Sequence, residues 1–255
     1  MNKILFYLLA VFMFFPLSYA HGFSNMGEDC SKCHSLTKDE ANQIVKNLDS
    51  RLSVIDIKPG PMKALWELTI ATGAQKTLFY LDFSKRYLVI GEMLDTKGKK
   101  NLTSDRMAEI NKVDVSSIPL ADAIVMGDKS APYKVIVFSD PECPYCAKLH
   151  QEIKKVTKKR KDIVFLVKMF PLPIHKGSYE KAKAIVCEKS LALLDDAFEK
   201  KDLPAAKCDT AVVDENIKLA AKLGINGTPA IIFPDGRVIP GAMEADALIQ
   251  ALEKK

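Results

Sequence analysis

Residues 133–146, YKVIVFSDPECPYC, decide the fold of the second half of the chain. Their first six residues form an apolar run, which is typical of a strand buried on both faces of a sheet. The stretch Cys143-Pro144-Tyr145-Cys146 follows closely, and we expect it to open a helix over about 143–160. A buried strand that leads into a helix is one step of an α/β layer.

The two cysteines of this stretch have the spacing of a redox pair. At a helix N-terminus, free N–H groups and the helix dipole stabilise a thiolate, so Cys143 is the expected nucleophile. Cys146 lies one turn further on the same face, where it can resolve a mixed disulfide. Pro144 suits the first helical turn, which needs no N–H donor. The alternatives are a structural disulfide or half of a zinc site, whose only other candidate pair, Cys30 and Cys33, belongs to another part of the chain.

The rest of the second half continues the α/β pattern. We predict a buried strand at 163–167, helices at 177–200 and 215–223, a hairpin over 230–239 and a closing helix at 245–252. Asp140 and Glu142 lie close to Cys143, where an acid would raise the pKa of the thiol. His150 and His175 are interpreted as polar surface residues.

A second short motif, Gly227-Thr228-Pro229-Ala230, precedes the first strand of that hairpin. Proline is tolerated at the start of a strand because the ladder needs no donor there. In the cis form, Thr228–Pro229 would present the Thr228 backbone beside the cysteine pair, where an extended substrate could bond to it. Because only ~5–6% of X–Pro bonds are cis, the sequence leaves the isomer open.

The first half reads as a small α+β unit. Thr37 and Glu40 fit a capping box that begins a helix over about 38–49. Three strand-like runs follow the break at 58–61, at 65–70, 77–83 and 87–90, and suggest an antiparallel meander. We assign 38–102 to this unit and 103–130 to a linker, with a helix capped by Ser104 and Asp105 and ended by Pro119.

Composition and the N-terminus indicate an exported globular protein. Of 255 residues, 48% are hydrophobic and 27% charged, with a net charge of +5, which excludes a collagen-like, disordered or multi-span chain and does not indicate a nucleic-acid binder. Residues 1–20 have a basic start, an apolar run and a small-residue exit at Ala20, as in a cleaved signal peptide. The alternative, an uncleaved anchor, would need a longer run of ~20 apolar residues.

Four further cysteines need an explanation in an exported chain, where disulfides form and persist. Cys187 and Cys208 most simply form a structural disulfide within one domain, worth roughly 3 kcal/mol for a loop of this size, and two free thiols are the alternative. Within the N-terminal segment 21–37, Cys30-Ser31-Lys32-Cys33-His34 matches the c-type haem attachment signature, with His34 as the iron ligand.

Three interpretations of that signature stay open. Covalent haem needs a packed apolar pocket, whereas mainly polar residues surround the motif. The cysteines would otherwise form an accessory redox pair that relays electrons, or a plain structural disulfide.

With these motifs the chain resembles the periplasmic thiol–disulfide isomerases of the DsbC/DsbG family. The resemblance rests on FSDPECPYCAKLH and GINGTPAIIFPDGRVIPG within 120–255 and, more loosely, on GPMKALWELTI, LFYLDF and KNLT within 58–103. It implies an α/β thioredoxin-like domain with a helical insertion over 131–255. It also implies a small α+β, cystatin-like dimerisation domain and a linker helix before it.

The resemblance further implies roles and partners. Cys143 would attack and Cys146 resolve, on either side of Pro144 and Tyr145; Pro229 would be the cis proline and Thr228 would contact substrate. A V-shaped homodimer would act on misfolded or misoxidised exported proteins in the periplasm, kept reduced by a membrane thiol reductase of the DsbD kind, with no required cofactor. The CxxCH motif departs from the best-known members of the family.

We therefore expect a protein disulfide isomerase or reductase. A dithiol oxidase is the nearest alternative, because CPYC does not encode the reduction potential. A haem-bearing electron carrier fused to a thioredoxin domain and a chaperone-like binder with an incidental cysteine pair are the alternatives from other classes.

Overall fold

The structure, a computed structural model, describes residues 34–253. The predicted signal peptide and the pair Cys30 and Cys33 lie outside the described residues. The chain divides after Ser35, so nearly all of the described residues belong to one compact unit, Leu36–Lys255.

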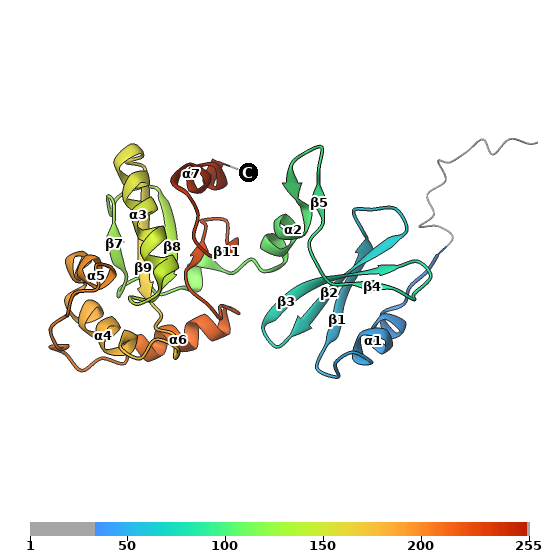
Figure 1. Ribbon diagram of the computed structural model, residues 1–255, viewed down its shortest axis with the longest axis horizontal. Helices are drawn as coiled ribbons and strands as arrows, with labels where there is room; N and C mark the ends of the chain where they lie inside the picture. The colour runs from blue at the N-terminus through green and yellow to red at the C-terminus, as the bar shows by residue number, and fades with distance from the viewer. Residues whose placement is uncertain (1–33, 254–255) are drawn as a thin grey trace, which may run out of the picture. The chain divides into compact units, whose positions relative to one another are not determined.

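The N-terminal part is one helix packed on an antiparallel sheet (Figure 1). Helix α1 (Lys38–Lys46) begins with the predicted capping box, in which the Thr37 hydroxyl accepts from the Glu40 N–H and the Glu40 carboxylate accepts from the Thr37 N–H. The sheet has the order β1-β2-β3-β4, with strands β1 (Ser53–Pro59), β2 (Leu65–Thr72), β3 (Gln75–Asp82) and β4 (Leu88–Val89). Its core joins α1 to the inner sheet face through Ala41, Val45, Val54, Trp66, Leu68, Ile70, Phe79 and Leu81.

Two expectations for this part need correction. The helix ends at Lys46 rather than 49, because Leu48 and Asp49 both donate to the Val45 carbonyl and leave the helix in a turn. Strand β1 was not expected. The register shifts between Val54 and Asp56, and this irregularity interrupts the alternation by which a strand is recognised.

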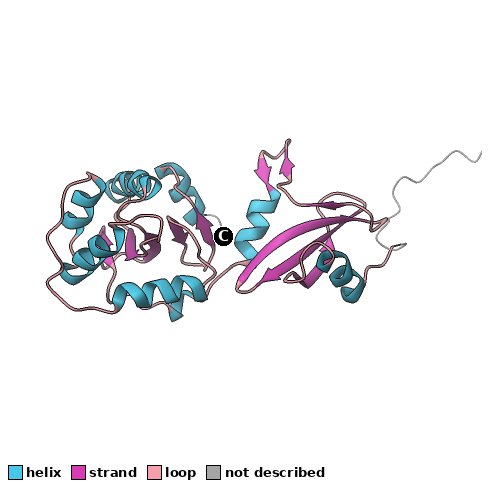
Figure 2. Ribbon diagram, turned by 60° about the horizontal axis from the view of Figure 1, so that its bottom comes forward, coloured by secondary structure: helices cyan, strands magenta, loops and turns pink. Residues whose placement is uncertain are grey.

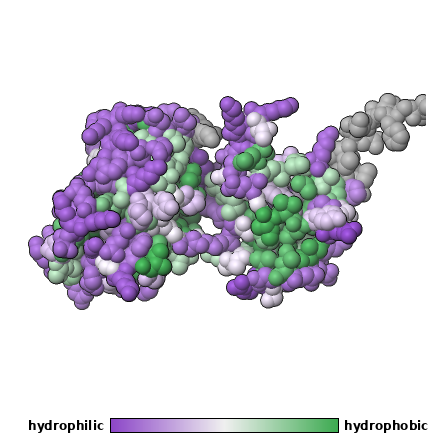
Figure 3. Space-filling model, viewed as in Figure 1, coloured by the Kyte–Doolittle hydropathy of each residue, from purple (hydrophilic) through white to green (hydrophobic). Residues whose placement is uncertain are grey.

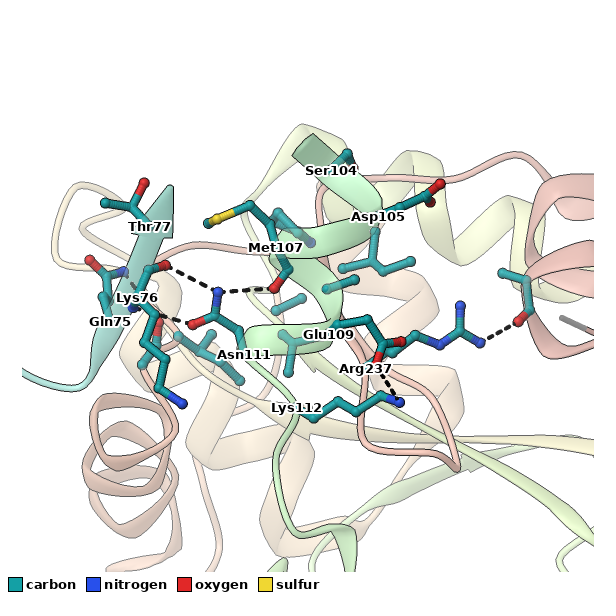
Figure 4. Close-up of a pocket in the computed structure, with 18 of the residues that line it drawn as sticks. Gln75, Lys76, Thr77, Ser104, Asp105, Met107, Glu109, Asn111, Lys112 and Arg237 are labelled. Carbon is teal, nitrogen blue, oxygen red and sulfur yellow. Dashed lines mark hydrogen bonds and ion pairs between the residues drawn. The ribbon is translucent and has the colours of Figure 1, made fainter. Parts of the chain in front are cut away.

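The predicted linker, residues 103–130, also needs correction. Helix α2 (Leu102–Ile110) begins earlier than predicted, because its N-cap is Asn101, whose side chain accepts from the Ser104 N–H. It follows a short hairpin of β5 (Leu94–Asp95) and β6 (Lys100–Asn101). At its end, Asn111 exchanges two hydrogen bonds with the backbone of Lys76, which fastens α2 to strand β3 (Figure 4).

Beyond α2 the chain enters the second core. A 3₁₀ turn at Val115–Ser117 precedes Ile118, which is buried, and strand β7 (Ile124–Met126). β7 falls within the residues assigned to the linker, yet it pairs with β9 and belongs to the C-terminal sheet. Lys168 of β9, 1% exposed, donates to the Pro119 carbonyl and to the Asp122 carboxylate, so the tail of the linker is fixed to this sheet.

The C-terminal sheet has the order β11-β10-β8-β9-β7. β8 (Tyr133–Ser139) and β9 (Ile163–Met169) are parallel and joined by α3 (Pro144–Lys159); β10 (Ala230–Ile232) and β11 (Val238–Pro240) form the predicted hairpin. Alternate residues of β8 face different cores, Val135 and Val137 one and Ile136 and Phe138 the other. The apolar run therefore marks a strand covered on both faces, as expected.

Helices lie on both sides of this sheet (Figure 2). They are α3, α4 (Ser178–Glu188), α5 (Leu191–Phe198), α6 (Val212–Lys222) and α7 (Ala245–Glu253). The single helix predicted at 177–200 is two, because Lys189 takes a left-handed conformation (φ 45°) and Ser190 caps a new helix. The arrangement is that of a thioredoxin-like domain with a helical insertion, in agreement with the expected fold class.

Candidate active site

The cysteine pair lies where β8 passes into α3. Cys143 is the N-cap residue of α3, Pro144 follows at the first helical position, and both thiols are free. Cys143 and Cys146 are 5% and 2% exposed, whereas Tyr145 between them is 66% exposed. The helix start therefore holds two buried cysteines with one exposed aromatic side chain between them in the sequence.

The two thiols differ in their acidity. The Cys146 thiol donates a hydrogen bond to the Cys143 sulfur and, with help from the Cys146 backbone N–H, lowers the pKa of Cys143 to about 5. Burial raises the pKa of Cys146. At neutral pH the pair therefore carries one negative charge, on Cys143, and Cys146 keeps its proton, which is the division of roles that an attacking and a resolving thiol need.

The second motif meets the first in the fold. The Thr228–Pro229 peptide bond is cis, and the Cys143 sulfur lies 3.5 Å from the Thr228 carbonyl oxygen across 85 residues of sequence. The buried Thr228 hydroxyl has no hydrogen-bond partner among the described residues. When Cys143 ionises, this hydroxyl can donate to the sulfur, which further lowers the pKa of Cys143.

A buried carboxylate beneath the site was not anticipated. Asp140, 0% exposed, accepts hydrogen bonds from the Glu142 N–H, the Leu172 N–H, the Ser178 hydroxyl and Nδ1 of His175. Three of these donors are 32–38 residues further along the chain, so no local pattern could show the contact.

Glu142 adds a second tie between the same segments. Its carboxylate accepts from the Gly177 N–H and from Lys181, and a Cβ at Gly177 would lie 2.5 Å from the Glu142 Oε1 atom. The pKa of Cys143 is lowered although these two acids lie close to it in the chain, and the largest cause is the hydrogen bond from the Cys146 side chain.

The two histidines are not plain surface residues. His150 is 3% exposed and bonds to Asp195, so its assignment to the surface is wrong. The side chain of His175 is 21% exposed and is held by Asp140 at 2.8 Å. Its partner is part of the cysteine loop, which places His175 in the site.

The remaining cysteine predictions divide between described and undescribed residues. Cys187 and Cys208 are joined by a disulfide with Cα atoms 5.7 Å apart, which links the end of α4 to the chain before α6. His34 is the first described residue, and its partners in the CxxCH motif lie outside the description. Within residues 34–253 there is no cluster of three or more metal-binding side chains, and no helix is long and apolar enough to cross a membrane.

Comparison with protein families finds two matches. Residues 34–104 match the disulfide bond isomerase protein N-terminal domain, and residues 120–255 match the thioredoxin-like domain. Together these two models cover all three described sheets.

Individual relatives agree. The probable thiol:disulfide interchange protein DsbC of Bordetella pertussis is 30% identical over 72% of this chain and 63% of its own length. The thiol:disulfide interchange protein DsbC of Escherichia coli K12 is 26% identical over 73% of this chain and 75% of its own. A crystal structure of a disulfide interchange protein from Neisseria gonorrhoeae is 30% identical over 54% of this chain and 97% of its own, with a TM-score of 0.47. The chain spans about 62–63% of the length of the Bordetella relatives.

Proposed function

The chain belongs to the DsbC-like proteins with a thioredoxin-like domain, and on that premise we propose that it catalyses thiol–disulfide exchange in exported proteins. The observation that carries the proposal is the pair of unlike thiols at the start of α3, with Cys143 ionised, Cys146 protonated and the Thr228 carbonyl 3.5 Å from the Cys143 sulfur.

The proposed reaction begins with the Cys143 thiolate. It attacks one sulfur of a substrate disulfide, so a Cys143–substrate disulfide forms and the second substrate sulfur leaves as a thiolate that takes a proton from water. In isomerisation, another substrate thiolate attacks the mixed disulfide, forms a new substrate disulfide and releases Cys143 as thiolate. No net electrons are transferred in that cycle.

Reduction follows when Cys146 acts instead. Its thiol loses a proton and attacks the Cys143 sulfur, which releases the reduced substrate and leaves a Cys143–Cys146 disulfide. Two electrons have then passed to the substrate, and a dithiol reductant must return them. We assign that role to a membrane thiol reductase of the DsbD kind. We propose that the protein acts in the periplasm, which it reaches through the signal peptide 1–20.

Single substitutions separate these routes. With a scrambled multi-disulfide protein as substrate, Cys143→Ser is expected to abolish recovery of native pairing. Cys146→Ser is expected to keep isomerisation, lose net reduction and accumulate mixed disulfides. Recovery by Cys143→Ser equal to that of the parent would instead favour the chaperone-like binder, and a measured reduction potential as high as that of dithiol oxidases would favour oxidation.

We also propose a homodimer formed through the N-terminal part. Figure 3 shows hydrophobic side chains gathered over the N-terminal sheet. Strand β4 is an edge strand, and Tyr87, Val89 and Ile90 in and beside it are 61%, 51% and 63% exposed. An exposed apolar edge strand pairs readily with a second chain.

The CxxCH motif supports a second candidate function, an electron carrier with haem bound covalently at Cys30 and Cys33 and ligated by His34. The exchange chemistry itself needs no cofactor. Intact mass of protein exported from a host that matures c-type cytochromes tests the motif. An increment of one haem with a visible absorption band would support the carrier, whereas thiols protected until reduction would indicate a disulfide.

A further inference from the structure

The buried Asp140 carboxylate holds one imidazole ring in a fixed place. Nδ1 of His175 donates to Asp140 Oδ2 at 2.8 Å, while the His175 N–H donates to the Leu172 carbonyl and the His175 carbonyl accepts from the Ser178 N–H. Leu172 and Ser178 also donate to the same carboxylate. Both the backbone and the ring of His175 are therefore constrained, although its side chain is 21% exposed.

Asp140 also sets the position of the nucleophile. Its carbonyl oxygen accepts a hydrogen bond of 3.2 Å from the Cys143 N–H, and its own N–H lies 3.4 Å from the Cys146 sulfur. One buried residue thus holds the imidazole through its side chain and the cysteine loop through its backbone. His175 and Cys143 are therefore both hydrogen-bonded to Asp140, at 2.8 Å and 3.2 Å.

The charges that face His175 are acidic. Asp140, Glu142 and the Cys143 thiolate all act on it, and the Lys181 ammonium is paired with Glu142. The hydrogen bond to Asp140 is the largest cause that raises the pKa of His175, and the Cys143 thiolate contributes through its charge. Such an interaction is reciprocal, because a thiolate that favours the imidazolium is favoured by it to the same extent.

We propose that His175, whose ring the Asp140 carboxylate holds at the cysteine loop, is a positioning residue for thiol–disulfide exchange, and that its imidazolium form favours Cys143 as the attacking and as the leaving thiolate. This inference rests on the proposed function and deepens it. Because the charge stabilises the reduced pair, its loss makes the pair more reducing and leaves less thiolate at a given pH.

The test is a pH titration of thiolate absorbance near 240 nm in the reduced full chain. The contribution of Cys143 is the difference between each protein and the same protein carrying Cys143→Ser. His175→Gln keeps a donor for Asp140 without the charge, and we expect it to raise the pKa of Cys143 by about half a unit to one unit. His175→Lys restores a cation and is expected to return the pKa toward that of the parent.

A matched control and a reciprocal measurement complete the design. Lys176→Gln removes the neighbouring exposed cation, which has no bond to Asp140 among the described contacts, and is expected to leave the titration unchanged. In NMR titrations, the pKa of His175 is expected to be lower in the Cys143→Ser variant than in the parent.

The outcomes separate this inference from the function on which it rests. An unchanged Cys143 titration in His175→Gln would overturn the inference, and equal shifts in the Gln and Lys variants would overturn it in favour of a tether without electrostatic effect. A pKa of ~8.5 for Cys143 in the parent protein, the ordinary value of a thiol, would instead contradict the activated nucleophile and with it the proposed function.

Discussion

At the scale of single residues, the site depends on the difference in pKa between two thiols, because Cys143 is ionised while Cys146 keeps its proton. The pKa of Cys143, about 5, lies well below the ordinary value for a thiol, so the reactive thiolate is lost only as the pH falls through that value. The linked stability has the same sign. The low pKa stabilises the reduced folded protein fully above the unfolded pKa of ~8.5, and this gain disappears as the pH falls toward 5.

We therefore expect alkylation of the reduced protein by iodoacetamide to modify Cys143 at a rate that rises around pH 5 and is nearly constant from about 6.5 to 8. Cys146 is expected to remain unmodified, because burial keeps it protonated. Peptide mass spectrometry after short reaction times measures both sites. Cys146→Ser replaces the donating thiol and serves as the comparison, with a midpoint above that of the parent. A Cys143 rate that climbs tenfold per unit from pH 6 to 8 would contradict the assignment.

The reactive residues that the sequence predicted lie in short motifs of neighbouring residues. Cys143 and Cys146 form a motif of four residues, and Thr228 and Pro229 are neighbours. Asp140 and His175 could not be found in this way, because their bond spans 35 residues and each residue alone is ordinary for a surface loop. The fold creates that part of the site.

At the scale of helices and strands, the residues at the ends of each element decided how accurately its bounds could be predicted from the sequence. The capping box at Thr37 and Glu40 was recognised because both partners are local. The start of α2 was misplaced because Ser104 and Asp105 are as favourable at an N-cap as Asn101, which holds that position. Strand β1 was missed because its irregular register hides the period of two.

The start of α2 can be tested directly. Asn101→Ala removes the side-chain oxygen that accepts from the Ser104 N–H, and it is expected to cost about 1 kcal/mol of unfolding free energy. Ser104→Ala is the matched control and should change it by less than about 0.5 kcal/mol, because the hydrogen bond uses only the Ser104 backbone. Urea unfolding followed by circular dichroism measures both, and the reverse ranking would restore the cap at Ser104.

At the scale of the whole molecule, the order of elements predicted the layer architecture but not the assembly. A continuous apolar strand, a helix, a second such strand and a late hairpin predict an α/β layer with mixed strands, whereas the thioredoxin-like fold was expected from the family resemblance. Whether two chains associate depends on which apolar side chains remain exposed, and this becomes visible only when the sheet order places β4 at an edge.

For the proposed dimer, we expect the double substitution Val89→Lys and Ile90→Lys to yield a monomer in size-exclusion chromatography with light scattering. Two charges per chain would face each other across the paired edges. Ile174→Lys, which changes an apolar residue of the C-terminal part that is 78% exposed, should leave the mass of the parent. The double variant should also keep the alkylation rate of Cys143. A loss of isomerisation activity in this variant would then report on dimer assembly and not on damage to the active site. A dimer that survives the double substitution would place the interface elsewhere.

The attachment of the linker tail to β9 has a practical consequence for dissecting the protein. A fragment 131–255 lacks β7 and leaves Lys168, 1% exposed, without the Pro119 carbonyl and the Asp122 carboxylate. A buried charge without its partners costs several kcal/mol, so this fragment is expected to be insoluble or unfolded, whereas a fragment 112–255 should unfold cooperatively on heating. Limited trypsin digestion should accordingly release a core that begins after Lys112. Asp122 and Pro119 stay with that core, and the smallest piece of the chain able to carry the chemistry is longer than its catalytic motifs suggest.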